Sequence, residues 1–269
     1  MIKKYRLGLR AVLVAFCVVA AVFAAGCGKP TESKTPASGR GGYSVVDATK
    51  TRIDFTHKPQ RIVSLGLSAD EVLLDMVEPE RIAALTYLAD DAGISPAAAK
   101  AERVKGRVQS GSLESVLAQQ PDLVLVPDWT DLNFVELLRG AKVPVYVYKT
   151  PTTVKEIKQT ICELANVVDE RVAGGKIVAK MEKELAFVQA RVGNMPAEER
   201  ISVMALSYMG PFGARGTTFA DICNYANVRN VVAEYDLPPN ATFSEETLIR
   251  LNPDLLVIPS WKYDNEQDP

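Results

Sequence analysis

Apolar segments of two kinds alternate along most of the chain. Runs of five or six residues rich in β-branched side chains predict buried strands, and longer stretches with apolar positions every three or four residues predict helices. The predicted strands are residues 61–65, 81–85, 122–126, 143–148 and 201–206, and the predicted helices include residues 112–119, 133–138, 153–167 and 219–225. Residues 68–71 have the spacing of a capping box, which predicts a helix beginning at Ser68. Strands that alternate with helices predict an α/β fold with parallel sheets, whose ligands bind at the carboxyl ends of the strands.

One predicted helix is longer than the others. Residues 169–192 carry a single apolar stripe and would reach about 36 Å at about 1.5 Å per residue, which is long for a strand-to-strand crossover. We therefore expect a linking helix, residues 169–194, between an amino-terminal lobe, residues 45–168, and a carboxyl-terminal lobe, residues 195–269. The alternative is one more packing helix of a single domain.

An internal repeat supports two similar lobes. Residues 112–129 (SLESVLAQQPDLVLVPDW) align without gaps on residues 244–261 (SEETLIRLNPDLLVIPSW), and seven of the 18 positions are identical. Each copy predicts a Ser-capped helix, a Pro-Asp turn, a buried strand, and then Pro and Trp at the carboxyl end of that strand.

The second copy lies close to the end of the sequence. The first lobe continues beyond Trp129 through a helix to a strand that ends near Thr150, but only eight polar residues follow Trp261. We therefore expect the second lobe to be truncated, lacking a helix and a strand. A naturally shortened lobe is the alternative.

The amino terminus has the pattern of an export signal. Four basic residues precede an uncharged apolar stretch, residues 11–25, which ends in Ala24-Ala25-Gly26-Cys27. Cys27 after small residues resembles a lipobox, so we expect residues 1–26 to be removed and Cys27 to carry lipid at the extracytoplasmic face of the cell membrane. A short membrane helix is the alternative. Residues 27–44 are rich in Gly, Ser, Thr and Pro, which predicts a flexible tether.

Composition then narrows the chemistry. The chain has 31 basic and 33 acidic residues, so it lacks the basic excess typical of a nucleic-acid partner. The single histidine, His57, precludes a multi-histidine metal site, and we expect it away from the strand ends. Outside the signal and Cys27, the cysteines are Cys162 and Cys223, which we interpret as two buried thiols in preference to a disulfide.

The chain resembles the substrate-binding proteins that serve ABC importers for cobalamin, haem and iron–siderophore complexes, which are periplasmic binding proteins of the helical-backbone class. The residues that carry the resemblance are 59–65 (PQRIVSL), Leu113-Glu114 with 121–125 (PDLVL), the 169–192 helix, and Glu246 with 253–257 (PDLLV). The resemblance runs from about residue 45 to the end. It implies two α/β lobes with a metal chelate bound between them, and no catalysis or resident cofactor. It also implies an importer permease as partner, which would dock on Glu114 and Glu246, and we expect a monomer. First-turn glutamates are also favoured by the helix dipole alone.

Candidate ligand-binding residues come from the predicted strand ends and loops. They are Leu67, Ser68, Tyr87, Asp128, Trp129, Tyr208, Arg215 and Trp261. The two tryptophans are equivalent in the repeat and would suit planar ligands, although packing beneath loops is the alternative. Arg215 could hold a carboxylate or stand in solvent, and Tyr87 or Tyr208 could be an axial ligand if the chelate is haem.

Other functions are less well supported by the sequence. An exported hydrolase-like enzyme would need a nucleophile motif such as G-x-S-x-G, which does not occur, and no Walker A pattern occurs either. A lipoprotein with a scaffold or adhesive role predicts no affinity for small molecules. Proteins that bind free metal ions need histidine and carboxylate clusters, so they are disfavoured.

Overall fold

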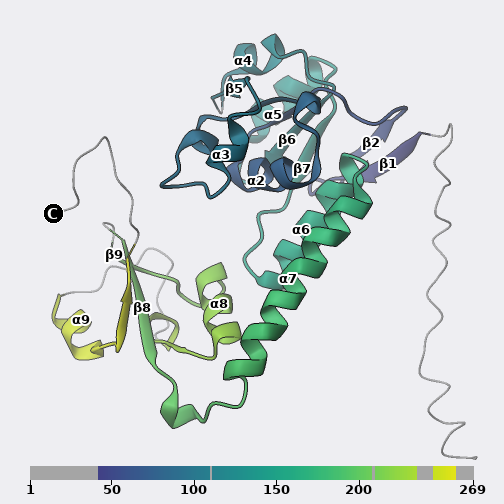
Figure 1. Ribbon diagram of the computed structural model, residues 1–269. Coiled ribbons are helices and arrows are strands. Elements are labelled where there is room, and N and C mark those ends of the chain that lie inside the picture. Colours follow the sequence, from purple (N-terminus) through teal and green to yellow (C-terminus); the bar gives the residue numbers. More distant parts are fainter. Residues whose placement is uncertain (1–41, 110, 208–209, 235–244, 259–269) are drawn as a thin grey trace, which may run out of the picture. The chain divides into compact units, whose positions relative to one another are not determined.

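The computed structural model of the chain describes residues 42–109, 111–207, 210–234 and 245–258 (Figure 1). All of the described residues belong to one compact unit that begins at Gly42. The expected lipid site Cys27 and the candidates Tyr208 and Trp261 lie outside the described residues.

A five-stranded parallel sheet organises the first half of the chain. Its strands follow the order β5-β4-β3-β6-β7, and every neighbouring pair is parallel. The strands are β3 (Ile62–Ser64), β4 (Ile82–Thr86), β5 (Arg107–Val108), β6 (Leu123–Pro127) and β7 (Val145–Tyr148). The expected parallel α/β fold is confirmed, and the predicted strands are displaced from the observed ones by one or two residues.

Helices cover both faces of this sheet, as the sequence predicts. They are α2 (Leu67–Met76), α3 (Ala98–Ala101), α4 (Leu113–Ala118), α5 (Leu132–Gly140) and α6 (Val154–Val167). Strand β6 shows why its sequence is continuously apolar: Leu123 and Leu125 enter the core with α2 and α6, and Val124 and Val126 enter the core with α4 and α5. Alternate side chains of a strand point to opposite faces, so a strand covered on both faces needs apolar residues at every position.

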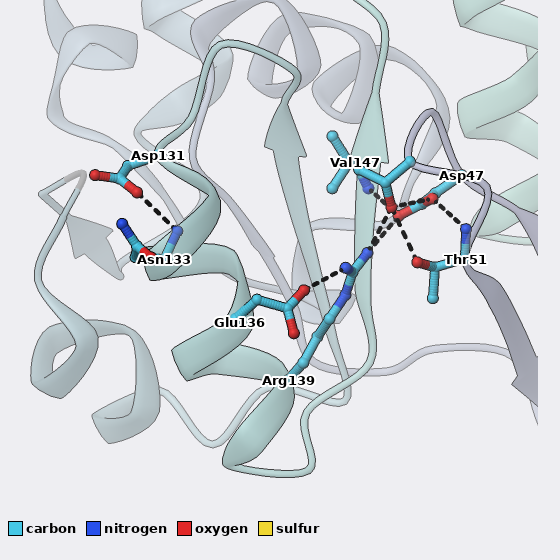
Figure 2. Close-up of polar contacts among 8 residues, drawn as sticks. Asp47, Thr51, Asp131, Asn133, Glu136, Arg139 and Val147 are labelled. Carbon is cyan, nitrogen blue, oxygen red and sulfur yellow. Dashed lines mark hydrogen bonds and ion pairs between the residues drawn. The ribbon is translucent and has the colours of Figure 1, made fainter.

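A hairpin that the sequence analysis missed opens the described chain. Strands β1 (Tyr43–Val46) and β2 (Arg52–Phe55) pair antiparallel, so ordered structure begins within the range expected for the tether, residues 27–44. The buried carboxylate of Asp47 fixes the hairpin turn. It accepts hydrogen bonds from Thr49 Oγ1 at 2.7 Å and Thr51 N at 2.9 Å, and it pairs with Arg139 of α5 at 2.7 Å (Figure 2). The hairpin is thereby attached to the first lobe.

Helix α7 (Arg171–Val192) is the long helix expected from the sequence. It begins two residues later than predicted, because Asp169 adopts a left-handed backbone conformation with φ of 55°. Most of its apolar stripe is only half-buried, and Val188 is 36% exposed. Although α7 is 22 residues long, none of the helices in the described ranges is apolar enough over a sufficient length to cross a membrane.

The crossing of α6 and α7 depends on Gly174. A Cβ atom at this buried glycine would lie 2.4 Å from the Cβ of Ala165 in α6, which is closer than two carbon atoms can approach. The next residue, Gly175, faces open space. Gly174 instead permits two helices to pack closely.

A second, smaller sheet follows α7. Strands β10 (Arg229–Asn230) and β11 (Leu255–Val257) flank β8 (Ser202–Ser207) in parallel, and β9 (Gly210–Phe212) pairs antiparallel with β8. Strand β9 is a short return strand that was not among the strands predicted from the sequence. Helices α8 (Thr218–Ala226) and α9 (Glu245–Leu251) belong to this part of the chain. Asn227, the C-cap residue of α8, donates to Val192 O at 2.5 Å, and this bond joins the end of α8 to the end of α7.

The repeat has a common structural basis in its Pro-Asp turn. Asp122 accepts backbone hydrogen bonds from Gln60 at 2.7 Å and Arg61 at 2.8 Å, just before β3 begins. Asp254 accepts one from Ser202 at 2.7 Å, where β8 begins. Strand pairing then begins at the same relative position in both sheets. Leu123, which follows Asp122, pairs with Ile62, and Leu255, which follows Asp254, pairs with Val203. The two repeat strands differ in cover, because β11 is 39–50% exposed and β6 is buried.

We expect Gly174→Ala to destabilise the fold by about 1–3 kcal/mol, because the added methyl group forces α6 and α7 apart. Gly175→Ala is the matched control and should stabilise the chain by about 0.5–1 kcal/mol, since alanine favours helix and meets no neighbour there. Urea unfolding followed by circular dichroism measures both. Equal effects of the two substitutions would contradict the close-crossing role of Gly174.

Candidate ligand site at the carboxyl edge of the first sheet

Two large aromatic side chains stand exposed where strands of the first sheet end. Tyr87 directly follows β4 and is 61% exposed, and Trp129 lies two residues after β6 and is 67% exposed. Parallel strands end at one edge of their sheet, so both side chains belong to the same edge. The alternative that Trp129 packs beneath loops is wrong, because most of its surface is free.

The connection from β3 to α2 lies at this carboxyl edge of the sheet, and we refer to its residues Gly66, Leu67 and Ser68 as the floor of the site. The expected capping box at Ser68 is wrong: α2 begins at Leu67, its N-cap residue is Gly66, and no side chain caps it. Ser68 instead lies inside the first turn, with its Oγ 3.1 Å from the hydroxyl of Tyr148. A Cβ at Gly66 would lie 2.2 Å from that same hydroxyl, so a glycine is needed for the phenol of Tyr148 to approach. Leu67 is half-buried beside them.

A buried carboxylate lies beneath this floor. Asp70 has no exposed surface, and its Oδ2 accepts hydrogen bonds from Thr86 N at 3.1 Å and Thr86 Oγ1 at 2.6 Å. Its Oδ1 is buried without a hydrogen-bond partner. Burial raises the pKa of Asp70 from 3.8 to about 6, although hydrogen bonds from Ser64 and Thr86 oppose the change. Thr86 immediately precedes Tyr87, so Asp70 holds the backbone that carries the exposed ring.

Tyr148 completes this buried group. Its side chain is 1% exposed at the end of β7, and burial raises its pKa to about 12, with further contributions from the charges of Asp70 and Asp128. Neither Asp70 nor Tyr148 was among the candidate residues expected from the sequence. Asp70 has the pattern of an ordinary first-turn acid, and Tyr148 that of an apolar strand residue, so only the fold brings them together.

Asp128 ties two strand ends together. Its carboxylate accepts hydrogen bonds from Thr150 N at 3.1 Å and Thr150 Oγ1 at 2.7 Å, which join the end of β6 to the segment after β7. Asp128 also lines a groove of about 690 Å³ between the hairpin turn and α6. A second depression, of about 420 Å³, is lined by Tyr87, Arg107, Val108 and Gln109.

The remaining candidates are placed as follows. Arg215 is exposed, and its Nε donates to Ala233 O at 2.5 Å, so part of its guanidinium is committed to the backbone. Glu114 and Glu246 are both exposed in the first turns of α4 and α9, and Ser112 caps α4 as expected. Helix α4 begins after β5, so Glu114 shares the carboxyl edge with Tyr87 and Trp129.

Histidine and cysteine do not contribute to this edge. His57 is exposed before β3, at the opposite ends of the strands, where its Nδ1 lies 3.0 Å from Thr56 Oγ1. Cys162 and Cys223 are free thiols; Cys223 is buried, but the expectation that Cys162 is buried was wrong. Among the residues that the structure describes, no three histidine, cysteine, aspartate or glutamate side chains gather as metal ligands.

The raised pKa of Asp70 predicts a pH-dependent cost of folding. Between about pH 4 and pH 6 the folded chain binds a proton that the unfolded chain has lost, so this carboxylate lowers the stability as pH rises. Two pKa units correspond to about 3 kcal/mol. Asp70→Asn should therefore gain about 3 kcal/mol relative to the natural chain between pH 4 and pH 7, as measured by urea unfolding across that range. Asp54→Asn, at an exposed ion pair, is the control, and parallel stability curves for Asp70→Asn and the natural chain would contradict the assignment.

Comparison with known proteins gives this edge a context. The family model described as "Periplasmic binding protein" matches residues 62–269. A cobalamin-binding protein of Halobacterium salinarum is 23% identical over 78% of this chain and 57% of its own length. The uncharacterized ABC transporter substrate-binding lipoprotein YvrC of Bacillus subtilis is 22% identical over 92% of this chain and 80% of its own length.

Solved structures agree on the fold. The molybdate-binding periplasmic protein of Haemophilus influenzae superposes with a TM-score of 0.68 at 17% identity, over 80% of this chain and 73% of that one. The family consists of solute-binding proteins and not of enzymes, in agreement with the expected absence of catalysis. Because the family match spans most of the sequence and includes both sheets, the chain belongs to the periplasmic binding protein family.

Proposed function

We propose that this protein is the membrane-anchored solute-binding component of an ABC importer. It captures a metal chelate (an iron–siderophore complex, haem or cobalamin) outside the cytoplasm and delivers it to the permease. The observation that carries the proposal is the exposure of Tyr87 and Trp129 at the carboxyl edge of a parallel sheet, in a chain of the periplasmic binding protein family. The sequence relatives named as cobalamin-binding and as a substrate-binding lipoprotein support it.

Exposed aromatic rings at a strand edge are suited to a large planar ligand. Fully buried Tyr and Trp side chains remove about 150–250 Å² each from water, and burial of apolar area contributes about 25 cal/mol per Å². A ligand that covers these two rings, which are mostly exposed in the free protein, would therefore gain several kcal/mol of binding free energy from their burial. The held backbone of Tyr87 limits the ordering that binding requires, because Thr86 is fixed by Asp70.

Anchoring and docking complete the proposed role. Cys27 would carry the lipid, and the residues up to Gly42 would tether the body outside the membrane. Glu114 and Glu246 would dock on the permease, each from the first turn of the helix that leads into a repeat strand. Because Glu114 shares the edge of Tyr87 and Trp129, the docked permease would meet the face that holds the ligand.

Ligand capture is tested by titrating the intrinsic fluorescence of the chain that begins at Cys27 with haemin, hydroxocobalamin, cyanocobalamin and ferric siderophores. We expect saturable quenching by one chelate class at micromolar or lower concentration. Trp129→Ala and Tyr87→Ala should each weaken that binding about tenfold or more, since each removes a ring from the edge.

Phe187→Ala is the matched control for these two variants. Phe187 is an aromatic side chain of α7 that is 54% exposed, and its ring contacts Arg191 and not the sheet edge. Its removal should leave affinity within about twofold. A folded protein that binds none of the three chelate classes would overturn the proposal and favour a lipoprotein without a transport role.

Docking is tested with the importer reconstituted in proteoliposomes. Glu114→Gln should leave chelate affinity within about twofold and lower chelate-stimulated ATP hydrolysis by the importer about tenfold, because a charged contact at the interface is lost. Glu102→Gln changes the same charge at an exposed position after α3 and is the control. Equal stimulation by the two variants would remove Glu114 from the docking surface.

A further inference from the structure

The carboxyl edge of the first sheet carries an excess of acid. The segments that leave β3, β4, β6 and β7 are residues 65–71, 87–97, 128–131 and 149–156, and they hold seven carboxylates against two lysines, Lys149 and Lys155. The carboxylates are Asp70, Glu71, Asp90, Asp91, Asp128, Asp131 and Glu156. The balance of the whole chain is close to neutral, so this excess is a local property of the edge.

Two cations of this edge, Arg107 and Lys149, are paired with carboxylates. Arg107, which reaches the edge from β5, donates from Nε to Asp90 at 2.7 Å and also bonds three backbone carbonyls. Lys149 pairs with Glu156 at 2.6 Å. Lys50, from the hairpin turn, lines the same groove as Asp128, and Lys155 is exposed on α6.

Most of the edge carboxylates have only neutral partners. Asp128 is bonded by Thr150, and Glu71 by Ser95 at 2.9 Å. Asp91 accepts from the backbone of Gly93, and Asp131 accepts from the backbone of Asn133, which is drawn in Figure 2. Neutral donors orient a carboxylate but leave its charge in place, so the field of these groups extends into the space above the edge.

Asp70 adds a charge of a different kind. It is fully buried, its Oδ2 accepts hydrogen bonds from Thr86, and its Oδ1 has no partner. Its charge is offset only in part by Arg107, whose guanidinium is bonded to Asp90. Mobile salt screens exposed charges strongly and buried charges much less. Asp70 is therefore a source of negative potential beneath Tyr87 that persists at high ionic strength.

We infer that the proposed chelate site selects by charge, favouring ligands with a net positive charge over anionic ones. The inference rests on the proposed function and names its substrate class: a cationic metal chelate, such as an aquated corrinoid or a cationic ferric hydroxamate. Haem with ionised propionates and ferric catecholates of high negative charge are disfavoured. The aromatic rings supply contact area to all of these ligands, and the carboxylates distinguish among them.

Two matched pairs of probes test this inference at pH 7.5 in the chain that begins at Cys27. Aquocobalamin, maintained as the cation, is compared with neutral cyanocobalamin, and cationic ferrioxamine B with anionic ferric enterobactin. We expect the cation of the pair that binds to be favoured by about tenfold at 20 mM salt, and by less at 500 mM salt because the exposed carboxylates are screened.

Substitutions separate the exposed charges from the buried one. Asn keeps an acceptor oxygen at each position, so Asp91→Asn and Asp128→Asn should each reduce the preference about threefold at low salt and little at high salt. Asp70→Asn should reduce the preference for cations at low and at high salt, because a buried charge is screened little. Glu80→Gln is the control, since it removes an exposed charge just before β4, at the opposite edge of the sheet. The melting temperature of each variant shows that it is folded.

The outcomes distinguish this inference from the proposed function. Binding of a chelate with equal or greater preference for the anionic probe would overturn the charge selection and leave the binding role intact. A preference for cations that Glu80→Gln weakens as much as Asp91→Asn would also overturn it, because the preference would then follow total charge and not the edge. Failure of all four probes together with binding of haemin would overturn the charge selection alone, and failure of the four probes and of haemin to bind the folded natural chain would overturn both.

Discussion

The architecture depends on a carboxylate placed at the start of a strand. In each sheet, the aspartate of a Pro-Asp turn accepts backbone hydrogen bonds from the residues that lead into the neighbouring strand, Asp122 from Gln60 and Arg61 and Asp254 from Ser202. Parallel strands have no tight turn to set their alignment, and a shift of one residue would exchange the two faces. The bonds to Asp122 fix the register of β6 against β3. This register also sets where the carboxyl ends of the two strands lie relative to each other. The positions of Trp129 and Ser68 are thus set from the opposite edge of the sheet.

The sequence predicted the elements in which local pattern and packing agree. Strand β6 is apolar at every position because it is covered on both faces, and α6 and α7 have an apolar stripe. Prediction failed where tertiary contacts decide. Hairpin β1–β2 has strands of only four residues each, and its turn depends on Asp47 and Arg139, which are 92 positions apart. Ser68 has capping-box spacing, but α2 begins one residue earlier, at Leu67, and its N-cap residue is a glycine because the phenol of Tyr148 occupies the space that a Cβ would need.

The candidate site also contains some residues that the sequence pattern could place and others that only tertiary contacts bring together. Tyr87, Asp128 and Trp129 could be placed at strand ends from the sequence, since a run of apolar residues followed by a polar or aromatic one marks a carboxyl end. The exposure of these side chains could not be predicted from the sequence, because it depends on which helices lie above them. Asp70 could not be found either, since a carboxylate in a first helical turn is ordinarily solvated. Its burial results from the approach of β4, whose last residue Thr86 covers it.

The first hairpin has a mechanical consequence. Any chain that precedes Gly42 enters the body through β1, so tension from an anchored end would act first on Tyr43. The Tyr43 hydroxyl donates to Val167 O at 2.7 Å, and its ring stacks on Phe55 with centroids 4.9 Å apart. Tension would therefore be shared between the end of α6 and the partner strand β2. A pull on the anchored end would load the helical layer and the hairpin together.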